Sequence, residues 1–482
     1  MTKNTTTAWA GSVFAALLIM SQATSASPIT VEPADLVFRG RAILTLDAAT
    51  PRAEAVAVRA GRIVFVGNAH DVTALVGSRT RVIDLGKRML MPAFHDSHIH
   101  PMSGGMRLLR CSLEQVPTAQ GVIDALGACA RRWPSSPWLI VTGLSETLAH
   151  AALLDRHALD RIVADRPLAI GIGPGFSLRV NSRALALGGL DRAGANATRS
   201  DIERDHATGE ATGYVSGDAM EAVRHLWPRP TSSEYRQALH QASEMANRFG
   251  IVSILDASVD EKMLDAYRAA DSAGELSLRV VAAQRINPEA GIAQIAAMRD
   301  ARDAIHSKRL RADAAKIFVD GEIELHTAAL LEPYVDAPEQ RGTTLLDTAL
   351  LDPLVTRLDR EGFDVHMHVM GDRAVRDGLD AIAGAIATNG ARDRRHELAH
   401  DQLIDQADVK RFAALGVIAN MQPAWAWNDS VNQDAESRLG PKRAHLLDPI
   451  GSLLAAKARV VASSDWPAPT LNPLEGIQIA IT

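Results

Sequence analysis

Short apolar runs alternate with amphipathic, helix-like stretches along most of the chain after Pro101. The runs with strand character are PWLIVTG, RPLAIGIG, GIVSILDAS, LSLRVVAAQ, DAAKIFVDG, FDVHMHVMGD, RRHELAHDQ, LGVIANMQP and ARVVASSD. A strand–helix–strand order repeated this many times predicts a parallel sheet with helices outside it. We therefore expect an α/β fold, namely a (β/α)8 TIM barrel. A doubly wound sheet is the alternative, but no Gly-rich phosphate motif follows the first strand, which disfavours its dinucleotide-binding form.

The segment before the barrel has a different pattern. Between Ala34 and Asp84, short alternating strands are separated by turn signals such as AGR and VGN, which is typical of a small β-domain. We assign residues 27–88 to a small N-terminal β-sandwich domain and residues 89–482 to the barrel.

The first 26 residues resemble an export signal. Lys3 gives a positive start, an apolar stretch runs from Trp9 to Met20, and small residues from Ala23 to Ala26 suit a cleavage site. The apolar stretch is short for a membrane span, so a retained anchor is the weaker interpretation. We expect the mature protein to be exported to the periplasm or secreted, without a membrane attachment.

The charge composition of the chain argues against one class of binding partner. The formal net charge is -6 and no basic stripe is present, which argues against nucleic acid. A small-molecule substrate is the expected partner, and a homodimer is left open. The two cysteines, Cys111 and Cys129, could pair in an oxidising compartment, although a chain of 482 residues also carries two thiols by chance.

The stretch MLMPAFHDSHIHPMSGG, from Met89 to Gly105, ends an apolar run in metal-capable side chains. His98 and His100 are two residues apart, so on a strand their side chains share a face and could chelate one cation. One such pair is weak evidence in a chain with sixteen histidines. The alternative is a pair of surface or capping histidines.

Lys316 interrupts the apolar run AAKIFVDG. A lysine that points into a barrel must find a partner or lose its charge. One interpretation is a salt bridge to Asp320 or another carboxylate. The other is reaction of the amine with carbon dioxide, which gives a carbamate able to bridge two metal ions.

Three later strands also end in ionisable residues. FDVHMHVMGDRAV places His366 and His368 on one strand face, and RRHELAHDQLID contains His396 and His400. Periodicity alone does not say which histidine of each pair is structural. RVVASSDWPAP ends in Asp465, which suits a helix cap as well as a catalytic group. Because the carboxyl ends of barrel strands converge on one rim, these distant residues could share a site.

Several long motifs in order resemble the amidohydrolase superfamily, in particular the YtcJ-like branch that includes N-substituted formamide deformylases (amidohydrolase family 3). The motifs are MPAFHDSHIHP, KIFVDG followed by TAALLEPY, HMHVMGDRAV, HELAHDQLIDQADVKRFAALGVIANMQP and SSDWPAPTLNPLEGIQ. The resemblance covers the chain from the β-domain onward. It implies a metal site made of His98, His100, Lys316, His368, His400 and Asp465, and so selects one histidine of each ambiguous pair.

The resemblance also implies a chemistry. Lys316 would be carboxylated and bridge two divalent ions, usually zinc, and a metal-activated hydroxide would attack an amide-type carbon–nitrogen bond other than a peptide bond. Asp465 would be the catalytic group that accepts and returns the proton. The alternatives are a mononuclear deaminase of the same superfamily and a truncated, non-catalytic remnant.

The sequence departs from the branch in three places. GEIELHTAAL carries Glu322, Glu324 and His326 where many relatives have small residues and an arginine, and Phe176 stands where a histidine is common. We therefore expect Glu322, His326 and Phe176 at a substrate pocket unlike that of the formamide enzymes. The sequence also reaches Thr482 soon after GIQIA, so we expect a barrel apparently truncated at the C-terminus, without its last helix and return strands.

Overall fold

The computed structural model of the chain describes residues 32–173, 175, 177–191, 201–427 and 430–482. The proposed signal peptide, residues 1–26, and Phe176 lie outside the described residues. The chain forms two compact units that divide after Pro92. No helix in the described part of the chain combines the length and the apolar character needed to cross a bilayer.

The first unit is a small β-domain. Its strands are β1 (Leu36–Leu44), β2 (Arg52–Arg59), β3 (Arg62–Gly67) and β4 (Arg81–Asp84), which pair in the order β3-β2-β1-β4. β1 is antiparallel to β2 and parallel to β4. Alternate residues such as Val37, Ala55 and Ala57 pack on Val72 to form a core. The described residues of this unit make one sheet, so the predicted sandwich is a single layer here.

The second unit contains the predicted barrel. Its eight strands are all parallel and neighbour one another in the order β18-β17-β16-β15-β14-β13-β12-β5. They are β5 (Phe94–Ile99), β12 (Ile251–Val259), β13 (Arg279–Arg285), β14 (Leu310–Phe318), β15 (Asp364–Val369), β16 (Glu397–His400), β17 (Ile418–Met421) and β18 (Arg459–Ala462). The two edges of this sheet meet where the hydroxyl of Ser97 donates a 3.1 Å hydrogen bond to the carbonyl of Ala462. The (β/α)8 fold is confirmed.

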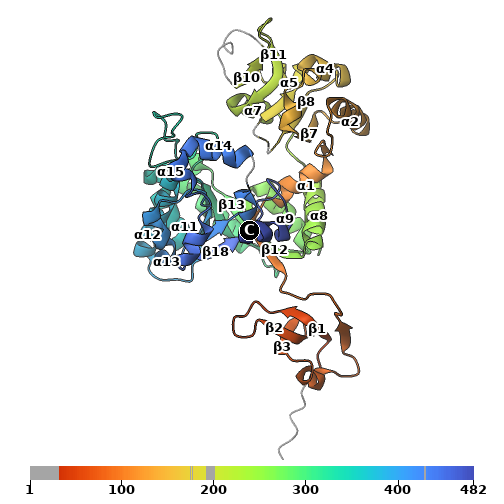
Figure 1. Ribbon diagram of the computed structural model, residues 1–482, viewed down its shortest axis with the longest axis vertical. Helices are drawn as coiled ribbons and strands as arrows, with labels where there is room; N and C mark the ends of the chain where they lie inside the picture. The colour runs from red at the N-terminus through yellow and green to blue at the C-terminus, as the bar shows by residue number, and fades with distance from the viewer. Residues whose placement is uncertain (1–31, 174, 176, 192–200, 428–429) are drawn as a thin grey trace, which may run out of the picture. The chain divides into compact units, whose positions relative to one another are not determined.

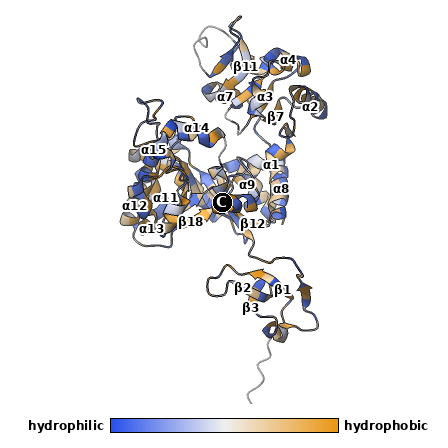
Figure 2. Ribbon diagram, in the orientation of Figure 1, coloured by the Kyte–Doolittle hydropathy of each residue, from blue (hydrophilic) through white to orange (hydrophobic). Residues whose placement is uncertain are grey.

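Helices cover the outside of the strands (Figure 1). They include α8 (Ser232–Arg248), α9 (Glu261–Ser272), α11 (Thr348–Arg360), α12 (Asp372–Asn389), α13 (Gln406–Leu415) and α17 (Pro473–Ile481). Figure 2 shows both hydrophobic and hydrophilic residues along these helices, as expected for helices with one buried face. The apolar side packs on the strands: Val365 of β15, Leu379 of α12 and Phe412 of α13 belong to one buried cluster.

A second sheet is inserted between the first barrel strand and α8. Its six strands pair in the order β10-β11-β9-β8-β7-β6. They are β6 (Cys111–Ser112), β7 (Leu139–Leu144), β8 (Leu168–Ile172), β9 (Ser177–Val180), β10 (Ile202–Arg204) and β11 (Ala211–Ser216). The runs PWLIVTG and RPLAIGIG thus form β7 and β8 of this insertion, and their expected place in the barrel was wrong. Apolar periodicity identifies a buried strand but not the sheet that it joins.

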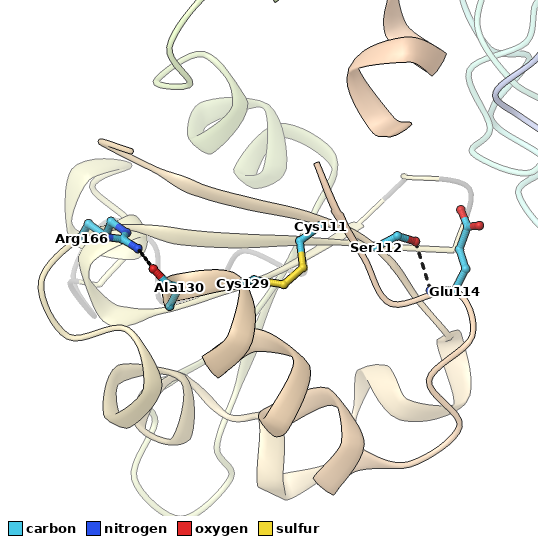
Figure 3. Close-up of a disulfide and its surroundings, with 6 residues drawn as sticks. All are labelled: Cys111, Ser112, Glu114, Cys129, Ala130 and Arg166. Carbon is cyan, nitrogen blue, oxygen red and sulfur yellow. Dashed lines mark hydrogen bonds between the residues drawn. A yellow bond between two sulfur atoms is a disulfide. The ribbon is translucent and has the colours of Figure 1, made fainter. Parts of the chain in front are cut away.

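A disulfide joins Cys111 of β6 to Cys129 of helix α2 (Ala119–Arg132), with their Cα atoms 6.1 Å apart (Figure 3). The bond closes a short loop, because the two residues are 18 positions apart. A loop of this size stabilises the folded chain by about 3 kcal/mol, chiefly through the entropy of the unfolded chain.

We expect reduction of this disulfide to lower the free energy of unfolding by about 3 kcal/mol. Urea unfolding of the oxidised protein, the reduced protein and a Cys111→Ser, Cys129→Ser double variant measures the effect. The reduced protein and the double variant should coincide. Equal stability before and after reduction would contradict the assignment of a stabilising crosslink.

Candidate metal centre

His98, His100 and Asp465 form a tight group at the carboxyl ends of β5 and β18. The Nε2 atoms of His98 and His100 lie 3.3 Å and 3.2 Å from Oδ1 of Asp465. Even so, neither the buried Nε2 of His98 nor this Oδ1 atom takes part in a hydrogen bond. Two ligand atoms bound about 2.1 Å from a tetrahedral ion lie roughly 3.4 Å apart. The spacing therefore fits three ligands of one cation better than a set of hydrogen bonds.

The backbone around Asp465 explains how the carboxylate reaches this position. Asp465 has a left-handed conformation, with φ of 52°, and its N–H donates to the carbonyl of His98 at 2.8 Å. The preceding residue, Ser464, donates from both its N–H and its hydroxyl to the buried carboxylate of Asp96. Burial raises the pKa of Asp96 to about 6, although the hydrogen bonds from Ser464 oppose this. Asp96 thus attaches the end of β18 to β5.

Lys316 is fully buried on β14, and its Nζ atom has no hydrogen-bond partner. Burial lowers the pKa of this amine to about 8, against the attraction of Asp465 and Glu322. The expected alternative, a salt bridge to Asp320, is not formed. Both carboxylate oxygens of Asp320 instead accept hydrogen bonds from three backbone N–H groups of the β14–α12 region, those of Ala329, Met370 and Gly371.

His368 and His400 lie beside Lys316 at the ends of β15 and β16. Their ring centres are 4.6 Å apart, and the ring of His400 is 4.8 Å from that of His98. The buried Nε2 atom of His368 has no hydrogen-bond partner. Burial lowers the pKa of His368 to about 3 and that of His400 well below its usual value. Both imidazoles are therefore neutral, the form that binds metal.

The six residues implied by the family resemblance thus meet at one rim of the barrel. In the strand register, Phe318 of β14 is opposite His368 of β15, and Val369 is opposite His400 of β16. Lys316 is opposite His366, so His368 lies two residues beyond the partner of Lys316, and His400 lies one residue beyond the partner of His368. The site residues are thus staggered along neighbouring strands, although more than three hundred residues separate His98 from Asp465. The unpartnered buried nitrogen and oxygen atoms among them fit one or more divalent cations.

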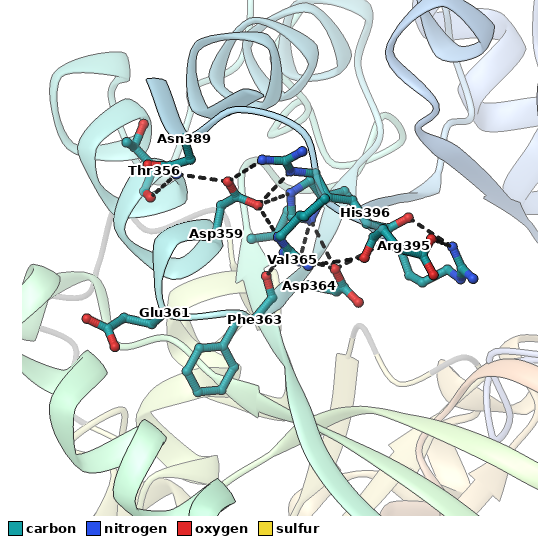
Figure 4. Close-up of polar contacts among 12 residues, drawn as sticks. Thr356, Asp359, Glu361, Phe363, Asp364, Val365, Asn389, Arg395 and His396 are labelled. Carbon is teal, nitrogen blue, oxygen red and sulfur yellow. Dashed lines mark hydrogen bonds and ion pairs between the residues drawn. The ribbon is translucent and has the colours of Figure 1, made fainter. Parts of the chain in front are cut away.

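The second histidine of each pair has a different place. His366 is buried next to His98, and its Nε2 atom is 2.9 Å from Nδ1 of His98. His396 is distant from this group: its Nδ1 accepts a hydrogen bond from the N–H of Val365, and its Nε2 lies 3.2 Å from a carboxylate oxygen of Asp359 (Figure 4). The selection of His368 and His400 as metal ligands stays a prediction, because His366 lies as close to His98 as His400 does.

The three residues expected to bind substrate have different surroundings in the structure. Glu322 reaches the rim, with Oε1 3.9 Å from Nε2 of His368. Burial and the neighbouring Glu324 raise its pKa well above the usual value. Nε2 of His326 lies 3.0 Å from both carboxylate oxygens of Asp336, and its ring lies 4.7 Å from that of Tyr334. Phe176 is not among the described residues.

Several residues that the sequence did not indicate interact with the imidazoles. Gln422 places Oε1 2.9 Å from Nδ1 of His400, and Trp425 stacks on the same ring at 5.0 Å. Both belong to the motif ANMQPAWAW, in which the Gln-Pro pair directly after a buried strand could have indicated them. Asp256, buried on β12, accepts a hydrogen bond from Tyr267 and interacts electrostatically with His100.

The chain is similar to several known proteins. The model of the amidohydrolase family matches residues 81–482. The chain belongs to the amidohydrolase family. It is 28% identical to the putative amidohydrolase YtcJ of Bacillus subtilis over 92% of this chain and 83% of that protein. It is 26% identical to the N-substituted formamide deformylase of Arthrobacter pascens over 93% of this chain and 83% of the enzyme.

Other relatives of this amidohydrolase are more varied. It is 27% identical to Protein LONG AFTER FAR-RED 3 of Arabidopsis thaliana, over 93% of this chain and 78% of the plant protein. The crystal structure of a metal-dependent hydrolase from Pyrococcus furiosus superposes with a TM-score of 0.75 at 24% identity, covering 92% and 88% of the two chains. That likeness shows the fold. Family membership supports a hydrolase, and the grouped ligand side chains support one that depends on a divalent metal.

Proposed function

We propose that this amidohydrolase cleaves an amide-type carbon–nitrogen bond other than a peptide bond, with two divalent ions, zinc by preference. The observation that carries the proposal is a set of buried atoms at one rim that form no hydrogen bond: Nε2 of His98, Nζ of Lys316, Nε2 of His368 and Oδ1 of Asp465. Each such atom is costly in a folded protein unless it has a partner. A pair of cations would satisfy all of them at once.

The residues divide naturally between two ions. His98, His100 and Asp465 would hold one, because their ligand atoms lie within 4.8 Å of one another. His368 and His400 would hold the other, and a carbamate on Lys316 would supply oxygen ligands to both. A bound divalent ion polarises a carbonyl and lowers the pKa of water toward about 7, so that hydroxide is available at neutral pH.

The chain's own side chains supply the remaining chemistry. Asp465 is the one carboxylate beside both His98 and His100 in the described ion pairs, so it is placed to accept a proton from water and pass it to the leaving nitrogen. Trp425, stacked on His400, and Glu322, beside His368, border the rim where a substrate would lie. We assign Glu322 a role in substrate binding, and His326 a supporting role through its loop.

One observation favours the mononuclear deaminase as a second candidate. Among the described residues, only His98, His100 and Asp465 meet the spacing of a group of three ligand atoms. A deaminase would hold one ion per chain and leave Lys316 as a free amine. Metal analysis of the purified protein distinguishes the two: about two ions per chain support the proposed amide hydrolase, and about one supports the deaminase.

Lys316 allows a sharper test of the carbamate. Its depressed pKa, caused by burial, leaves a large part of the amine uncharged near pH 8, which is the form that reacts with carbon dioxide. We expect Lys316→Ala to lower the metal content from about two ions per chain to about one, and short-chain carboxylates to restore the second ion. The exposed Lys410 of α13 gives the control variant, Lys410→Ala, which should bind metal normally.

Labelling with 13C-bicarbonate gives an independent readout of the carbamate. The wild type should show a carbamate signal by NMR that Lys316→Ala lacks. A wild type with no such signal and full activity would refute the bridging role of Lys316.

The substrate class can be tested directly. We expect the zinc-loaded protein to hydrolyse at least one member of a panel of N-acyl, N-formyl and cyclic amide compounds, and a chelator to abolish the activity. Turnover of aminated heterocycles with ammonia release, and of no amide in the panel, would replace the proposed function with the deaminase.

We also propose that the protein is exported, with residues 1–26 removed. The disulfide between Cys111 and Cys129 supports this proposal, because such bonds persist in oxidising compartments. N-terminal sequencing of the protein recovered from the periplasm or the medium of a bacterial host tests it. Recovery of the uncleaved chain from the cytoplasm alone would contradict it.

A further inference from the structure

An unbroken line of hydrogen bonds runs from His98 across the inside of the barrel. Nδ1 of His98 is 2.9 Å from Nε2 of His366, and Nδ1 of His366 is 3.2 Å from Oε2 of Glu397. The amide nitrogen of Asn420 donates to the same Oε2 atom at 2.7 Å and to the carbonyl of Ser97 at 2.9 Å. Four strands, β5, β15, β16 and β17, thus each contribute one member.

The end of this line decides where each hydrogen lies. The Glu397 carboxylate only accepts, so Nδ1 of His366 must carry its hydrogen and donate it. In the neutral ring, Nε2 of His366 is then an acceptor. Nδ1 of His98 therefore donates to His366, and the lone pair of His98 lies on Nε2. That atom is the one 3.3 Å from Oδ1 of Asp465.

The other two buried imidazoles of the site, His400 and His368, have neutral hydrogen-bond partners. Nδ1 of His400 faces the neutral amide oxygen of Gln422 at 2.9 Å, and His368 has a backbone hydrogen bond to Gly321. A carboxylate at the far end of a histidine relay raises the basicity of the metal-binding nitrogen more than a neutral amide or carbonyl does. Among these three rings, the line from His98 alone ends on a carboxylate.

We propose that His366 and Glu397 are positioning residues, which hold His98 in the form that binds metal through Nε2. As a result, the metal position formed by His98, His100 and Asp465 has the higher affinity of the two. This inference rests on the proposed metal-dependent function. Its consequence is ordered loading: the first ion enters the position of His98, and the second enters that of His368 and His400.

Two substitutions at position 366 separate the hydrogen bond from the shape of the ring. His366→Phe fills similar space without an acceptor, whereas the amide oxygen of His366→Gln can reach toward the place of Nε2 and accept from His98. Zinc affinity is measured for both positions by competition with chelators of graded strength. We expect His366→Phe to weaken the tighter ion by about 10- to 100-fold, and His366→Gln to recover most of that loss.

Glu397→Gln tests the charge at the end of the line. Its amide oxygen can still accept a hydrogen bond, so we expect a smaller loss for the tighter ion than in His366→Phe. His396→Gln is the matched control, because His396 neighbours Glu397 in sequence but contacts Asp359 instead. Its zinc affinities should equal those of the wild type. Thermal melting of each metal-free variant checks that it is folded, and His366→Gln and Glu397→Gln carry the test if His366→Phe does not fold.

The outcomes distinguish this inference from the proposed function. Two ions bound by the wild type, with equal affinities in all folded variants, would overturn the positioning role and leave the hydrolase intact. A wild type that binds no divalent ion would overturn both. Imidazole 15N spectra of the metal-free wild type add a readout independent of metal: the hydrogen of His98 should lie on Nδ1, and a hydrogen on Nε2 would refute the relay.

Discussion

Asp465→Asn is expected to lower kcat by about 10²- to 10⁴-fold, the range set by loss of a general acid or base. Asparagine keeps the shape of aspartate but has no charge and cannot accept a proton from water. Oδ1 of Asp465 lies within 3.3 Å of the Nε2 atoms of both His98 and His100, so the substitution also removes the one anionic ligand of that group. We therefore expect a weaker first ion together with the loss of turnover.

The measurement is steady-state kinetics on the amide identified by screening, with the metal content of the same sample. A loss that persists at saturating zinc belongs to proton transfer, whereas a loss that zinc restores belongs to metal binding. Asp372→Asn is the control, since this carboxylate at the start of α12 accepts from the N–H of Leu331 and contacts none of the ligands. Wild-type turnover by Asp465→Asn would contradict the proposal that hydrolysis takes place at this rim.

The sequence predicts which strands contribute to the site better than it predicts which side chains meet there. Strand ends of a (β/α)8 barrel converge, so the order of the strands predicted that their polar ends could share a rim. The choice of His98, Lys316, His400 and Asp465 as ligands came from the family resemblance. Strand alternation could not separate His366 from His368, because residues two apart on a strand share a face. The two rings differ in their contacts: Nε2 of His366, opposite Lys316, lies against Nδ1 of His98, whereas Nε2 of His368, two residues farther along β15, forms no hydrogen bond.

The errors have physical reasons as well. The runs that form β7 and β8 are as apolar as barrel strands, and only the antiparallel pairing of β8 with β9 places them in a separate sheet. A pairing partner is a long-range property, which local periodicity does not contain. His326 was expected at the substrate pocket; it hydrogen-bonds Asp336, ten residues later, and its place at the pocket stays a prediction.

The second prediction concerns the stability of the fold and rests on the buried carboxylate of Asp359, away from the metal ligands. Asp359, in the last turn of α11, is completely buried and accepts hydrogen bonds from Arg394, Arg392 and Asn389 (Figure 4). His396 completes the set at 3.2 Å. These groups come from the end of α12, from the loop that follows it and from the residue before β16, so one carboxylate attaches three segments to each other.

Asp359→Asn should lower the free energy of unfolding by about 3–5 kcal/mol, because it leaves two half-buried guanidinium groups beside a buried neutral amide. Urea unfolding measures the change. The control is Asp364→Asn: this carboxylate bonds Arg392 at 3.2 Å and the N–H of Arg395 at 3.0 Å, but it is partly exposed, so about 1 kcal/mol or less is expected. Both variants should keep the zinc content of the wild type.

The stabilisation of the fold by Asp359 should also be lost at acid pH. Burial by itself raises the pKa of this carboxyl, but hydrogen bonds from Arg394, Asn389 and Arg392 outweigh burial and hold the pKa well below its usual range. A depressed folded pKa means that the stabilisation is complete above the unfolded pKa of about 3.9 and is lost as the pH falls further. The stability difference between wild type and Asp359→Asn should therefore be constant from pH 5 to 8 and shrink below about pH 4. A difference that grew toward acid pH would mean that the carboxylate is not the ionised centre of this network.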